Sequence, residues 1–138
     1  MTRFLILTVF AYAACIAPTA VGTAAEDGLL TDKTLVVWAS PADLKQTGGS
    51  ALTVNDTTAD HFDGVVFAEL APRVWMPGSN GHSRTCKEQA DWPKETVAAG
   101  RLVQLAIVYR GRDITVYRDG ALYAKYTMDG QPFAFGAQ

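Results

Sequence analysis

Cysteine is scarce in this chain, which holds only Cys15 and Cys86 among 138 residues. A framework of disulfides of the kind that holds small secreted domains together is therefore excluded, and the fold must be stabilised by burial of apolar side chains. An excess of positive charge is also lacking, since 12 Lys and Arg stand against 14 Asp and Glu. We therefore expect neither nucleic acid nor an anionic membrane surface as the partner.

Sustained helical periodicity is a further absence. No segment of the chain beyond residue 33 repeats its apolar residues at helical spacing over several turns, so we expect little helix. The chain has instead short runs rich in β-branched and aromatic residues, separated by Gly, Pro, Asn and Asp. Such runs are typical of strands in an antiparallel sandwich or barrel.

The first 25 residues have the composition of a secretory signal peptide. Arg3 precedes the apolar run 4–14, and small residues then lead to an Ala-x-Ala-like cleavage site at Ala25. The apolar run is too short to span a membrane. We therefore expect a secreted or periplasmic protein with no membrane span, in which the signal (1–25) and a polar tether (26–33) precede one folded domain (34–138).

Cys15 closes the run Tyr12-Ala-Ala-Cys15, which has the form of a bacterial lipoprotein box. Tyr is a poor first residue for that box and the apolar run before it is short, so we do not expect lipid anchoring. Removal of the signal would leave Cys86 without an intramolecular partner. Cys86 is then a free thiol or the partner of a cysteine in another segment.

The clearest structural signal is a hairpin. Two β-rich runs within Asp113–Thr127 are joined by Asp119-Gly120, a pair that accepts the positive φ angles of a type I′ turn. The strand-like run Leu102–Tyr109 precedes them after a short polar turn, which predicts an antiparallel meander. Further strands are predicted at Thr34–Trp38, with Trp38 in the core, and at Ala51–Val54, Gly64–Leu70 and Arg73–Met76.

The pattern fails between Pro77 and Gly100, where Gly, Pro and polar residues predict one long irregular loop. A loop of this length in a compact domain is usually functional. The chain stops after Phe133–Gly136, which has the pattern of an entry to another strand. Seven or eight strands are few for two complete sheets with protected edges, so we expect an all-β antiparallel sandwich that is truncated at its C-terminus.

Four segments share one family pattern: Leu35–Pro41, Gly48–Val54, Leu102–Tyr109 and Ile114–Gly120. They resemble the LamG-like group of the concanavalin A-like lectin/glucanase superfamily, over about residues 34–135. The resemblance implies a jelly-roll sandwich. Residues 62–69, followed by Trp75–Ser79, further resemble a module that precedes family 32 glycoside hydrolase domains, which cleave fructans, in exported bacterial proteins.

Catalytic carboxylates are missing from the places where related hydrolases have them. Family 32 enzymes carry a Trp-Met-Asn-Asp-Pro-Asn-Gly signature, and here Gly78 stands where that signature has its nucleophilic Asp. Glucanases of the superfamily place Glu-x-Asp-x-x-Glu along a strand, whereas Glu69 stands alone on its predicted strand. Because glycoside hydrolysis uses two carboxylates, the chain offers no catalytic constellation, and His82 with Cys86 lacks a third group to orient them.

Sugar binding requires exposed aromatic faces together with polar side chains that meet hydroxyl groups. The long loop and its margins supply five candidates for such contacts: Trp75, Asn80, His82, Arg84 and Trp92. Packing inside the domain is the competing interpretation of each aromatic residue.

Three aspartates, Asp56, Asp60 and Asp63, are candidate ligands for Ca²⁺, which LamG-like domains often hold on a rim loop. The competing interpretation, which we favour, is a polar turn in which Asp side chains bond the backbone. The two histidines are too far from any cysteine pair to predict a zinc site.

We interpret the chain as a non-catalytic module of an exported protein, with a glycan or an adjacent hydrolase domain as its partner. Two alternatives stay open from the sequence. The chain is either the N-terminal fragment of a family 32-type hydrolase whose catalytic domain lies elsewhere, or a structural adhesion module.

Overall fold

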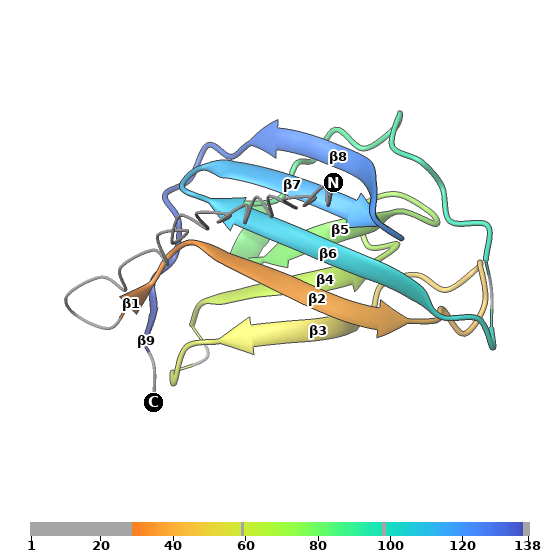
Figure 1. Cartoon of the computed structure of the whole chain (residues 1–138), viewed down its shortest axis with the longest axis horizontal. Helices are drawn as coiled ribbons and strands as arrows, with labels where there is room; N and C mark the ends of the chain where they lie inside the picture. The colour runs from red at the N-terminus through yellow and green to blue at the C-terminus, as the bar shows by residue number, and fades with distance from the viewer. Residues whose placement is uncertain (1–28, 59, 98, 137–138) are drawn as a thin grey trace, which may run out of the picture.

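The computed structural model describes residues 29–58, 60–97 and 99–136, and these form an antiparallel β-sandwich (Figure 1). It contains nine strands and one 3₁₀ turn: β1 (Leu29–Leu30), β2 (Lys33–Ala39), β3 (Ser50–Asn55), β4 (Phe62–Phe67), β5 (Trp75–Ser79), η1 (Asn80–His82), β6 (Val103–Arg110), β7 (Asp113–Arg118), β8 (Ala121–Thr127) and β9 (Phe135–Gly136). The predicted all-β fold is confirmed. The predicted signal peptide and Cys15 lie outside the described residues.

Two main sheets form the layers of the sandwich. The four-stranded sheet has the order β2-β6-β7-β8, and the three-stranded sheet has the order β3-β4-β5. A short pair, β1 with β9, closes one end of the molecule (Figure 1). Part of the segment predicted as a tether (26–33) belongs to strands, because Leu30 pairs with Phe135 and Lys33 begins β2.

The meander follows the predicted chemistry of its turns. Asp119 and Gly120 have φ angles of 48° and 78°, as a type I′ turn between β7 and β8 requires. Between β6 and β7, Gly111 has φ of 53° while Arg112 does not have positive φ, as in a type II′ turn with glycine at its first central position. Two local turns therefore fix the register of three neighbouring strands, with Leu105 opposite Arg118.

The core lies between the two sheets and consists mostly of side chains that alternate along the strands. On β6, Val103, Leu105, Ile107 and Tyr109 are buried while the residues between them are not. The buried apolar cluster comprises Leu35, Val65, Phe67, Ala68, Trp75, Val103, Leu105, Ile107, Tyr109, Ile114, Val116, Tyr123 and Met128. Burial of this cluster provides the main driving force for folding.

The same alternation overturns the core position predicted for Trp38. Because Leu35 and Val37 point toward the core side of β2, Trp38 points to the opposite face and is 59% exposed. The boundaries of the third and fourth predicted strands were also wrong, since these strands begin at Phe62 and Trp75 rather than Gly64 and Arg73. The third predicted strand ends at Phe67 rather than Leu70, and the fourth extends to Ser79, three residues into the predicted loop.

Candidate functional site

The outer face of the three-stranded sheet is hollowed into a groove of about 370 Å³. This volume lies within the range of small-molecule sites. Because Val65 and Phe67 of β4 belong to the core, the alternate residues Phe62, Gly64 and Val66 point to this outer face. The groove, called the outer groove below, is lined by Gly48, Gly49, Ser50, Thr53, Asn55, Phe62, Val66 and Glu69.

Two glycines beside the outer groove leave no room for a side chain at their positions. Gly64 of β4 pairs directly with Gly78 of β5. A Cβ atom on Gly78 would come within 2.5 Å of Val66 Cγ2, and one on Gly64 would come within 2.8 Å of the Leu52 carbonyl oxygen. Side chains at these two positions would therefore crowd the residues that shape the groove, and glycine inside a strand is typical of such close approaches.

One wall of the groove is polar and belongs to the edge strand β3. The hydroxyl oxygens of Ser50 and Thr53 lie 2.6 Å apart in a hydrogen bond, and Asn55 extends the same wall. Each of these side chains can both donate and accept hydrogen bonds. Opposite this wall, the floor presents the ring of Phe62 and the side chain of Val66, so the groove combines an apolar surface with polar groups.

Glu69 closes one end of the groove and is paired with a histidine from another segment. His82 Nε2 lies 3.4 Å from Glu69 Oε1, and the two side chains are 29% and 46% exposed. Two reversals of the chain produce this pair. Ala68, with φ of 55°, ends β4, and Gly81 and His82, with φ of 54° and 57°, turn the chain after β5.

A second cavity of about 310 Å³ lies between the long loop and β8. Its lining includes His82 and Arg84, which were predicted as ligand contacts, together with the free and half-exposed Cys86. Cys86 Sγ lies 3.5 Å from the carbonyl oxygen of Glu88. The hydroxyl group of Tyr126 donates to the Arg84 carbonyl oxygen over 2.9 Å and so closes the bottom of this cavity.

Two of the five predicted ligand residues are enclosed by the protein. Trp75 is 2% exposed, and its Nε1–H donates to Glu95 Oε2 over 2.9 Å. Arg84 is also 2% exposed, and its Nε–H donates to Asp63 Oδ1 over 2.8 Å. Both side chains bond internal carboxylates, so their polar groups are already engaged within the protein, although Arg84 also borders the second cavity.

The other three predicted ligand residues are spread over the loop. Asn80 fastens the start of β4, because its Oδ1 accepts the Phe62 N–H over 2.6 Å. Trp92 packs beside Tyr123 and Tyr126, with ring centroids about 6 Å apart. Only His82 contributes to the edge of the outer groove, through Glu69. The structure therefore does not gather the five residues into one site.

The three predicted calcium ligands are also separated. Asp63 points inward and is fully buried, with Lys33 Nζ 2.8 Å from its Oδ2. Asp56 holds its own turn by accepting the Asp60 N–H over 3.0 Å, and the hydrogen bond with His61 lowers the pKa of its carboxyl group. Within the described residues, no three His, Cys, Asp or Glu side chains gather where they could hold one metal ion.

Sequence reasoning missed the β3 and β4 residues of the outer groove. Thr53, Asn55, Phe62 and Val66 are ordinary strand residues, and only the fold brings them onto one face beside Glu69. A usable signal was present in Gly64, since glycine in a predicted strand often marks a place where a ligand or backbone comes close, whereas Gly78 was predicted to lie in the loop.

A family model described as the Concanavalin A-like lectin/glucanases superfamily matches residues 19–138. No curated protein and no solved structure matches the chain. Among the described residues, the structure has no helix that is long and apolar enough to cross a membrane.

Proposed function

Because the chain belongs to the Concanavalin A-like lectin/glucanases superfamily, we propose that its domain is a non-catalytic module that binds a glycan in the outer groove. The observation that carries this proposal is the composition of the groove. The Phe62 ring and Val66 offer an apolar surface for the C–H face of a sugar, and Ser50, Thr53 and Asn55 offer hydrogen bonds to its hydroxyl groups.

The single carboxylate of the groove supports binding rather than hydrolysis. Retaining and inverting glycosidases both place two carboxyl groups across the scissile bond. Of the eight residues that line the outer groove, Glu69 alone carries a carboxylate. A sugar held there would meet one carboxylate, but not the two carboxyl groups that hydrolysis requires, one as the acid and the other as the nucleophile or base.

The experiment that tests glycan binding is a glycan array followed by titration calorimetry on the soluble domain. Thr53→Val replaces a hydroxyl group of the groove by a methyl group of the same shape, and we expect about a fivefold or greater loss of affinity, the size of one hydrogen bond. Thr115→Val makes the same change on the outer face of the four-stranded sheet and serves as the matched control. Uniformly negative arrays, or equal effects of the two variants, would refute binding in the outer groove.

A second candidate function, positioning of a neighbouring domain, is favoured by the outer face of the four-stranded sheet. Val36, Ala106, Tyr117 and Leu122 lie in register across its four strands. Val36 and Leu122 are 41% and 63% exposed, and Trp38 beside them is 59% exposed. Exposed apolar patches of this kind often mark contacts with other proteins.

The domain-positioning candidate has its own test. We propose a family 32-type glycoside hydrolase domain as the neighbour, so the reading frame downstream of Gln138 should encode one. In that longer protein, quenching of Trp38 fluorescence by acrylamide should fall several-fold relative to the single domain. The Trp38→Phe variant isolates this signal from the other two tryptophans, and equal quenching of Trp38 in both proteins would contradict the candidate.

We also propose that the protein is exported, on the strength of the signal-peptide composition of residues 1–25. Expression of the full chain in a bacterium should yield a periplasmic or secreted product whose N-terminal residue is close to Glu26. Retention of Met1 in the mature product would contradict export.

A further inference from the structure

The charge of Glu69 bears on which glycans the outer groove accepts. Glu69 is the one lining residue with a charged side chain. It stands at the end of the groove, next to Gly48 and Gly49, and its carboxylate lies 3.4 Å from His82 outside the lining. Every other polar group of the lining is a hydroxyl, an amide or backbone.

The backbone holds Glu69 in a defined place. Ala68, the residue before it, is buried and has φ of 55°, a conformation that is unfavourable for alanine. Two hydrogen bonds fix this residue, since the Ala68 N–H donates to the Val74 carbonyl over 2.8 Å and the Gly48 N–H donates to the Ala68 carbonyl over 3.0 Å. The start of the Glu69 side chain is therefore set by the sheet, and the His82 ring lies beside its far end, with Nε2 3.4 Å from Oε1.

A carboxylate in this position has opposite consequences for two classes of sugar. It accepts hydroxyl hydrogen bonds, which are stronger to an ionised acceptor than to a neutral one. It also repels a second carboxylate or a sulfate brought into the same groove, where water is partly displaced and the repulsion is less screened than in bulk solution.

We infer that Glu69 makes the outer groove selective for uncharged sugars over acidic ones, and that His82 is the residue that positions Glu69 for this role. This inference rests on the proposed function. It goes beyond it by naming the chemical class of glycan and the pair of residues that decides between classes.

The test uses trigalacturonic acid and its fully methyl-esterified form, which differ in charge and in the added ester methyl groups, together with uncharged fructo- and xylo-oligosaccharides. Affinities are measured by calorimetry at neutral pH and low salt. We expect the wild-type protein to bind uncharged ligands about tenfold or more tightly than the acidic one, the size of one partly screened repulsion. The ratio should shrink as salt is added.

Three variants separate the roles of the pair. Glu69→Gln should bring the ratio of affinities for the ester and the acid close to one. Glu88→Gln, which removes the same charge from the loop outside the outer groove, should leave the ratio unchanged. His82→Asn, which keeps a residue that tolerates positive φ, should weaken binding of uncharged sugars several-fold, and His82→Gln, whose longer side chain carries N–H donors, should restore most of it.

The outcomes distinguish the two proposals. Failure of every sugar to bind, with the domain folded, refutes the proposed function itself. Binding of uncharged and acidic ligands with equal affinity by the wild-type protein, or an unchanged ratio in Glu69→Gln, refutes the selectivity while leaving glycan binding intact. Equal affinities of wild type, His82→Asn and His82→Gln refute the positioning role of His82.

Discussion

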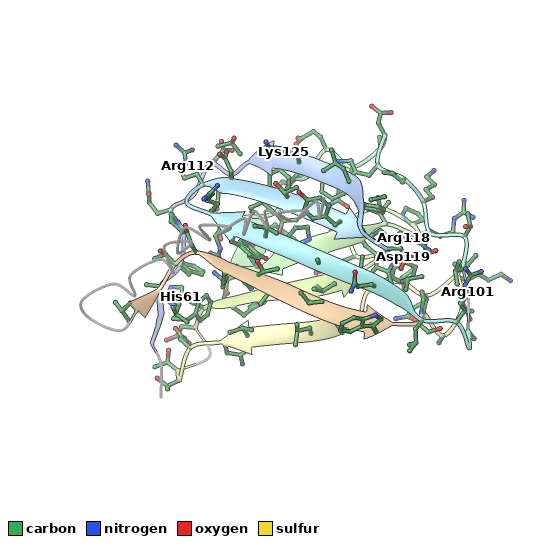
Figure 2. All side chains as sticks on the ribbon, in the orientation of Figure 1. His61, Arg101, Arg112, Arg118, Asp119 and Lys125 are labelled. Atoms are coloured by element: carbon green, nitrogen blue, oxygen red, sulfur yellow. The ribbon has the colours of Figure 1, made fainter. Side chains whose placement is uncertain are left out.

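Each end of the sandwich buries one carboxylate, and each carboxylate holds the segment between β5 and β6 against the sheets. At the end near β1 and β9, Asp63 contacts Arg84 of that segment and Lys33 of β2. At the opposite end, where Figure 2 labels Arg118 and Asp119, the carboxylate belongs to Glu95 of the segment itself. We call the two groups the Asp63 cluster and the Glu95 cluster.

The Asp63 cluster is satisfied mainly by charge. Two cations meet one carboxylate, and both Asp63 and Arg84 are almost fully buried. Arg84 also donates to the Phe62 carbonyl over 2.7 Å, and its guanidinium lies over the ring of Phe133. Removal of Arg84 would therefore leave the Asp63 carboxylate buried with less compensating charge and little access to solvent.

In the Glu95 cluster, the carboxylate is satisfied mainly by several well-oriented hydrogen bonds. Glu95 accepts two parallel hydrogen bonds of 2.8 Å from Arg118, one from Trp75 and two from the N–H groups of Thr96 and Val97. The Arg118 side chain is 24% exposed, so water can reach it. The Asp63 carboxylate is therefore stabilised mainly by its cations, whereas the Glu95 carboxylate is stabilised by several independent hydrogen-bond donors.

The largest expected effect comes from breaking the Asp63 cluster. Arg84→Met keeps much of the side-chain volume but leaves Asp63 with Lys33 alone, and we expect a loss of about 3–5 kcal/mol in the free energy of unfolding. Urea denaturation measures this loss. Arg110→Met, an exposed arginine at the end of β6, is the control and should change stability by less than about 0.5 kcal/mol. A loss below about 1 kcal/mol for Arg84→Met would show that Lys33 suffices for Asp63.

A smaller effect is expected in the Glu95 cluster. Glu95→Gln keeps one carbonyl acceptor but loses the ion pair and part of the donor set, while Arg118 can turn to solvent. We expect a loss of about 2–3 kcal/mol by the same urea measurement. If this variant cost as much as Arg84→Met, the proposed contrast between the two clusters would be wrong. Glu88→Gln provides the matched surface control.

The Glu95 cluster also predicts how stability depends on pH. Burial alone raises the pKa of Glu95, but the hydrogen bonds from Arg118, the Val97 N–H and Trp75 outweigh it and lower the pKa from 4.5 to about 2. Since the folded state binds this proton more weakly than the unfolded state, the stabilisation is present above pH 4.5 and is lost as the pH falls toward 2.

Comparison with Glu95→Gln isolates that contribution from those of other carboxyl groups. The variant has no proton to gain at this position, so the wild-type advantage of about 2–3 kcal/mol near neutral pH should narrow steadily below pH 4.5 and nearly vanish near pH 2. Urea denaturation at several pH values measures it. A gap that stays constant with pH would contradict the assigned pKa shift of Glu95.

The smallest expected loss of stability comes from removing one hydrogen-bond donor of the Glu95 cluster, the Trp75 Nε1–H. Trp75→Phe removes the Nε1–H from Glu95 and a little core volume, for an expected loss of about 1–2 kcal/mol in urea denaturation. Trp38→Phe makes the same change on an exposed face. It should cost less than about 0.5 kcal/mol. Equal losses would mean that neither the hydrogen bond nor the buried volume of the Trp75 indole adds measurably to stability.

Local chemistry made much of the fold predictable. Asp119 and Gly120 specify the β7–β8 hairpin because few other pairs accept two successive positive φ angles. The alternation along Val103–Tyr109 likewise identifies an inner and an outer face from the sequence alone. The core position predicted for Trp38 was wrong because alternation along β2, with Leu35 and Val37 on the core side, places Trp38 on the outer face.

The candidate site was less predictable. Trp75 and Arg84 have the residue types of ligand contacts, yet each meets a carboxylate from a distant part of the chain, Glu95 or Asp63. Nothing in the local sequence distinguishes an arginine that faces a ligand from one that faces a buried aspartate. Residues such as Thr53 carry no unusual signal before the fold places them beside Phe62 and Glu69.

Period-two alternation and turn chemistry act between near neighbours, so the amino-acid pattern is enough to predict most of the main strands and the turns of the β6–β8 meander. Which polar side chains are internal partners, and which line the outer groove, depends on how the two sheets pack. Contacts such as Arg84 with Asp63, or His82 with Glu69, join residues 21 and 13 positions apart. Such contacts depend on strand order and on reversals at Ala68 and Gly81, which arise only when the two sheets pack.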